Sequence, residues 1–93
     1  MLVLIKSSPD TPEGKRGIKM ATDLGAEMVL IQNGVYLAKH VALQDLDRPV
    51  YLLDEDTRLR GINLEGLGNN LKVINYDGLV NLMMDHEKVI GLF

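Results

Sequence analysis

MVLIQNG, residues 28–34, decides the fold class of this 93-residue chain. Its first four residues are apolar without alternation, which is typical of a strand buried on both faces of a parallel sheet. The polar triplet Gln32-Asn33-Gly34 then ends the strand in a turn. The stretch therefore predicts a parallel sheet that is covered by helices on both faces.

Similar short apolar runs occur along the chain and alternate with segments of helical character. Strands are expected at residues 2–5, 28–31, 50–53 and 71–74, with a fifth strand or an extended tail at 88–93. Helices are expected at about 12–24, 35–41 with a possible continuation to 46, 54–60, and from about 77 to 86. This order predicts one α/β domain over residues 1–93, a three-layer α/β/α Rossmann-like fold with a mainly parallel sheet of about five strands.

The first helix carries the clearest start and stop signals. Thr11 is suited to cap it, Pro12 to occupy its first position and Gly25 to end it. From the helical spacing, the residues expected on its inner face are Gly14, Gly17, Ile18, Ala21 and Leu24.

Composition excludes several classes of function. The net charge of −3 and the absence of a basic stripe argue against direct binding of nucleic acid. The chain has no cysteine, so it forms no disulfide, thiolate metal site or thiol nucleophile of its own. No apolar stretch reaches membrane-spanning length and no signal peptide is visible, so we expect no membrane partner and a cytoplasmic location.

The loops after the strands are the expected place for a site in an open α/β sheet. Ser7, Asn33, Gly34 and Asp54 are the candidate residues in these loops. Asn33-Gly34 could offer backbone N–H groups to an anion, but turn chemistry explains the same pair and is favoured. The run from Asp54 to Asp56 could bind a divalent cation, but charge stabilisation of a helix start is favoured, and no metal is expected.

No catalytic residue and no cofactor are predicted. The two histidines, His40 and His86, have no adjacent nucleophile in an elbow sequence, and His86 is expected to be a half-buried residue at a helix end. Glycine-rich nucleotide-binding motifs are absent.

The methionines suggest a contact surface. Met20 and Met83 are expected to fill the core, Met83 on one helix face with Leu79, Leu82 and His86. Met84 lies one step around the helix from Met83, so one of the two faces outward or toward a partner. Met84 is therefore a candidate interaction residue.

Taken together, several segments resemble the DsrH/TusB family. They are residues 2–9, 30–36, 50–56 leading to Arg60-Gly61, and 76–86. The resemblance implies a DsrEFH-like fold and a place beside DsrE/TusD-like and DsrF/TusC-like subunits. Such complexes relay sulfur as a protein persulfide, toward 2-thiouridine at the tRNA wobble position or within sulfur metabolism.

Two departures from the family pattern bear on the role. Some members carry a cysteine in the first helix, where Gly17 stands here, and the tail ends in Gly91-Leu92-Phe93 in place of a Trp-containing strand. A glycine forms no persulfide, so the resemblance implies a TusB-type, non-catalytic subunit. The alternatives left open are a stand-alone homo-oligomer that binds a small ligand and an enzyme using Ser, Asp or His, against which the missing thiol and motifs weigh.

Overall fold

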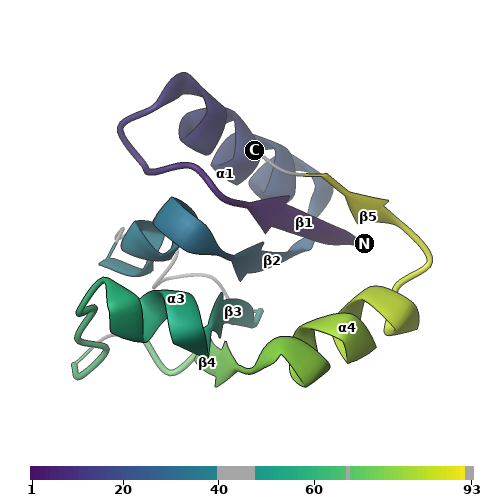
Figure 1. The fold of residues 1–93 in the computed structure, drawn as a ribbon. Coiled ribbons are helices and arrows are strands. Elements are labelled where there is room, and N and C mark those ends of the chain that lie inside the picture. The colour runs from purple at the N-terminus through teal and green to yellow at the C-terminus, as the bar shows by residue number, and fades with distance from the viewer. Residues whose placement is uncertain (40–47, 67, 92–93) are drawn as a thin grey trace.

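The computed structural model describes residues 1–39, 48–66 and 68–91 (Figure 1). Short strands and helices alternate along these residues. In chain order they are β1 (Leu2–Ile5), α1 (Pro12–Leu24), β2 (Glu27–Leu30), the 3-10 helix η1 (Gln32–Lys39), β3 (Val50–Leu53), α3 (Asp54–Leu59), β4 (Leu71–Ile74), α4 (Tyr76–Asp85) and β5 (Val89–Ile90).

The strands form one five-stranded sheet in the order β4-β3-β2-β1-β5, and every neighbouring pair is parallel. This confirms the predicted fold class. β2 lies one residue earlier than predicted, because Glu27 pairs with Leu2 at its start and the backbone turns at Gln32, whose φ is +48°. β5 is shorter than expected and pairs through Val89 and Ile90 alone.

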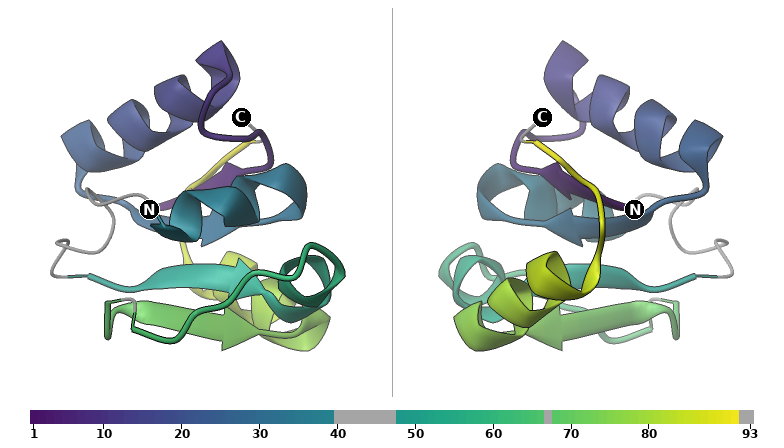
Figure 2. Two further views of the ribbon diagram at one scale, coloured as in Figure 1. Left: turned by 90° about the vertical axis from the view of Figure 1, so that its left-hand side faces the viewer. Right: turned by 90° about the vertical axis from the view of Figure 1, so that its right-hand side faces the viewer.

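Side chains alternate between the two faces of the sheet and build two separate cores. On one face Val3 and Ile5 pack in a cluster with residues of α1 and η1. On the other face Leu2, Leu4 and Val29 are buried, and among the described helices α4 alone supplies residues to this cluster, Leu79 and Leu82. Figure 2 shows the resulting layers, with α4 on the side of the sheet opposite η1.

Local signals predicted α1 well. The Thr11 side chain accepts the Gly14 N–H at 3.1 Å, Pro12 is the first helical residue, and Gly25 ends the helix in the left-handed conformation. The prediction for Leu24 was wrong, since its side chain is 49% exposed. The turn at Gly25 brings Ala26 into the core in its place.

Two other helix predictions need correction. η1 begins at Gln32, inside the predicted turn, and the expected continuation at 40–46, including His40, lies outside the described residues. On α4, Leu79 and Leu82 face the sheet as predicted, but Met83 is 41% exposed and does not fill the core. α3 and α4 otherwise begin close to where the sequence placed them.

Candidate functional site

Parallel strands end at the same edge of a sheet, so the predicted loop residues come to one edge of this molecule. The best-connected group there centres on Asp56, whose residue is 9% exposed. Its carboxylate accepts the Gln32 N–H at 2.7 Å and lies 3.5 Å from the Arg60 guanidinium. Arg60 also donates from Nε to the Asn33 side-chain oxygen at 3.0 Å. The loop after β2 is thereby tied to α3.

The Gly34 backbone is used inside the protein. Its N–H donates to the Ile31 carbonyl at 2.8 Å and to the Lys6 carbonyl at 3.1 Å. A Cβ atom at this position would lie 2.1 Å from the Ile5 carbonyl oxygen, so only glycine lets η1 approach the end of β1 this closely. The hydrogen bonds favour the turn interpretation of Asn33-Gly34 over an anion site.

The other loop candidates lie apart from the Asp56 group. Asp54 forms an exposed ion pair with Arg58, 3.0 Å apart and one helical turn along α3. Ser7 is half-buried before α1, where its carbonyl oxygen lies close to Gly14. The described part of the chain holds no group of three or more His, Asp or Glu side chains placed to bind a metal ion.

Acidic residues of α3 also meet the start of α4. The negative charge of Glu55 raises the pKa of the Tyr76 hydroxyl, and partial burial, the charge of Asp56 and a hydrogen bond with Glu55 act in the same direction. Tyr76 is nevertheless 55% exposed. The contact therefore marks a surface where an aromatic ring and carboxylates lie side by side.

A second polar contact connects residues 59 positions apart and was missed by the sequence analysis. His86 Nε2 lies 2.7 Å from the Glu27 carboxylate, and Nδ1 lies 2.7 Å from the Leu82 carbonyl oxygen. The carbonyl contact agrees with the expected helix-end position of His86. The contact with Glu27 is the one that joins distant segments. The contact ties the end of α4 to the start of β2.

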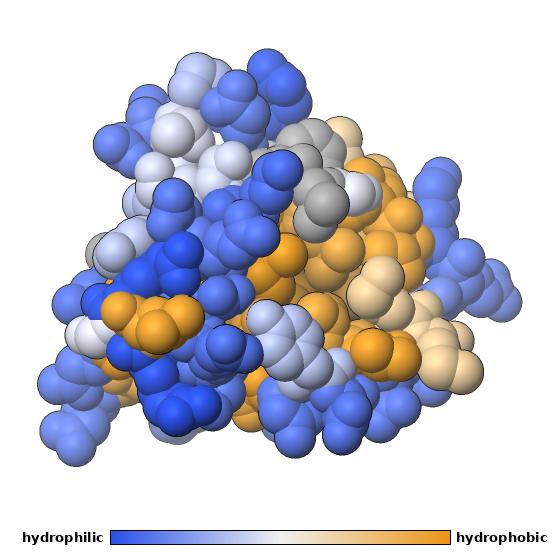
Figure 3. Space-filling model, viewed as in Figure 1, coloured by the Kyte–Doolittle hydropathy of each residue, from blue (hydrophilic) through white to orange (hydrophobic). Residues whose placement is uncertain are grey.

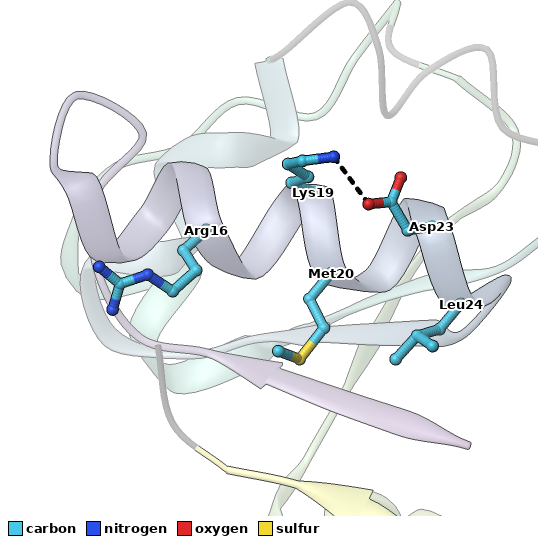
Figure 4. Close-up of a pocket in the computed structure, with 5 residues that line it drawn as sticks. All are labelled: Arg16, Lys19, Met20, Asp23 and Leu24. Atoms are coloured by element: carbon cyan, nitrogen blue, oxygen red, sulfur yellow. Dashed lines mark hydrogen bonds and ion pairs between the residues drawn. The ribbon is translucent and has the colours of Figure 1, made fainter.

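A shallow hollow of about 350 Å³ lies along α1 (Figure 4). Met20 and Leu24 line its apolar part, so Met20 does not fill the core as predicted but borders this hollow. Lys19 and Asp23, also on its rim, pair with each other at 2.8 Å. Its described lining comes from one helix and offers no convergent polar groups, which are the mark of a specific small-molecule site.

Comparison with known proteins identifies the family. The profile described as "DsrH like protein" matches residues 7–89. The chain belongs to the DsrH family. Membership supports a role as a sulfur-relay subunit in general terms, acting in a complex with other subunits of that relay.

The DsrH-family chain also shares its fold with a solved structure. The crystal structure of the ychN protein from E. coli superposes with a TM-score of 0.77, covering 99% of this chain and 97% of that one at 15% identity. At this identity the likeness shows the fold alone. No curated protein sequence gives a significant match. Among the helices of residues 1–39, 48–66 and 68–91, none is long and apolar enough to span a membrane.

Proposed function

We propose that this DsrH-family chain is a thiol-free, non-catalytic subunit of a sulfur-relay complex. DsrE/TusD-like and DsrF/TusC-like partners carry the persulfide cysteine, and residues 1–93 act as one DsrEFH-like domain that shapes the assembly. The observation that carries the proposal is the family match over residues 7–89 in a chain without a single cysteine. A persulfide forms on a thiolate sulfur, so this chain has no atom that holds the relayed sulfur.

The geometry of the strand-end loops supports a structural role for them. The Gln32 N–H donates to Asp56, and Arg60 donates to Asn33. The Gly34 N–H donates to two backbone carbonyl groups. Groups engaged in this way position loops and leave little free to bind a substrate. We place the complex in the cytoplasm, serving wobble-uridine thiolation of tRNA or sulfur metabolism, with any contact to nucleic acid made by other subunits.

The test is assembly with the proposed partners. The chain is co-expressed with the DsrE-type and DsrF-type proteins of the same genome, and the mixture is analysed by size-exclusion chromatography with light scattering. We expect one species that contains all three chains. Separate elution of this chain from a partner complex that forms without it would contradict the proposal, and a ligand-binding homo-oligomer would become the better reading.

A further inference from the structure

One flank of α4 is apolar and exposed. Tyr76, Val80, Met83 and Met84 follow positions i, i+4, i+7 and i+8 and therefore form one continuous strip on the helix, here called the α4 stripe. Their exposed fractions are 55%, 52%, 41% and 78%. The stripe lies beside the face that carries Leu79 and Leu82, so the apolar surface of α4 extends beyond the part that the sheet covers.

The helix layer that contains α4 buries fewer residues than the opposite layer, which contains α1 and η1. α4 contains no fully buried residue, whereas α1 and η1 together bury Gly14, Gly17, Ala21, Gly34, Val35, Leu37 and Ala38. Figure 3 shows a broad apolar area across the middle and right of that view, over the region of β1, β5 and α4. Soluble monomers rarely leave contiguous apolar surface of this kind uncovered, so a binding role explains it. Tyrosine and methionine are also among the residues enriched at interfaces.

The charges around the α4 stripe indicate what kind of partner binds there. Asp77 lies two turns before Met84 on the same side of α4, Glu55 lies against Tyr76, and residues 75–87 contain no lysine or arginine. Lys88 and Lys72 are the nearest basic residues along the chain. In a two-fold dimer through α4, the same acidic rim would face itself, and like charges across an interface oppose association. A partner with an apolar centre and a lysine- or arginine-rich rim complements both features.

We infer that the α4 stripe is a docking surface for a different protein chain, one that presents apolar side chains bordered by basic ones. The inference rests on the proposed function, since the partner is taken to be the DsrE-type or DsrF-type subunit of the complex. It adds which face of this chain binds and what chemistry the partner surface has.

The lack of native cysteine allows a clean footprint of this face. In the Met84→Cys variant the one thiol of the chain lies at the most exposed position of the stripe, and in the Lys15→Cys variant it lies at an exposed position of α1, which packs on the other face of the sheet. Each variant is treated with a maleimide, alone and mixed with the partner subunits, and the labelled fraction of this chain is measured by mass spectrometry. We expect the mixture to slow labelling of Met84→Cys about tenfold or more while Lys15→Cys changes little, because a buried thiol is protected from reagent.

Each alternative outcome has a distinct meaning. If the complex forms and the Met84→Cys thiol stays reactive, the docking face is wrong while the proposed function stands. If the thiol is already protected in the isolated chain at the same concentration, the occupant is a second copy and the inference is overturned. If no complex forms, both the proposed function and the inference fail.

The basic rim of the partner has its own test. Replacing Asp77 by asparagine removes rim charge without touching the apolar stripe. We expect slower association with the partner subunits and a weaker dependence of the association rate on salt, as charge steering predicts. An unchanged rate at low salt would contradict a charge-complementary partner, and Asp23→Asn on α1 is the matched control.

Discussion

Gly34 shows how one missing side chain positions a helix. In Gly34→Ala the new Cβ atom would lie 2.1 Å from the Ile5 carbonyl oxygen, which is backbone and has little room to yield. We expect a loss of about 2 kcal/mol in the free energy of unfolding, measured by urea denaturation, as for other overpacked sites. Gly91→Ala is the control, since no atom lies within 4 Å of its added Cβ. Equal stability of the two variants would show that η1 does not depend on this close approach.

Tyr51 gives a pH-dependent test on the α4 side of the sheet. Burial raises the pKa of its hydroxyl, and the negative charge of Glu27 raises it further. A raised pKa in the folded state means that stability is present below the unfolded pKa, about 10, and is lost as the pH rises above it. The free energy of unfolding of the native chain should fall above about pH 10, and that of Tyr51→Phe should fall less steeply. Parallel pH profiles for the two proteins would contradict this assignment.

At the scale of elements, the loop after β2 and helix α3 are held together by Asp56. Asp56→Ala removes the carboxylate that accepts the Gln32 N–H and that lies beside Arg60. We expect a loss of about 2 kcal/mol in the free energy of unfolding, typical of a lost hydrogen bond to a charged group. Asp54→Ala, two residues away, breaks only an exposed ion pair with Arg58 and should cost about 0.5 kcal/mol or less. The prediction fails if the two variants are equally stable in urea.

The same two aspartates show what the sequence could and could not predict. Both were read as acids that stabilise a helix start, because spacing along α3 does not reveal that Asp56 turns inward to the Gln32 N–H. The bounds of β1, β3 and β4 and the Thr11 and Gly25 caps were predicted correctly, since they depend on neighbours within a few residues. The contact of His86 with Glu27 joins distant segments and had no local signal.

At the scale of the whole molecule, the two faces of the sheet differ in how completely they are covered. Sequence reasoning placed Met83 in the core, because its spacing from Leu79 fits an inner helical face. The structure leaves both Met83 and Met84 on the surface, together with Tyr76 and Val80. Met83 was predicted to lie in the core but is exposed, and this difference reveals the α4 stripe. The apolar surface that the fold does not use is then available to a complex.

The central claim, that this chain supports a sulfur relay without carrying sulfur, is tested most directly with labelled persulfide. A cysteine desulfurase and radiolabelled cysteine supply sulfur to the reconstituted complex, and label on each separated chain is counted. We expect label on the cysteine-bearing partners and none on this chain. Single substitutions of Ser7, Asn33, Asp54 and His86 by alanine should leave transfer largely intact wherever the complex stays whole. Stable label on this chain, or loss of transfer from one of these variants in an intact complex, would contradict the account.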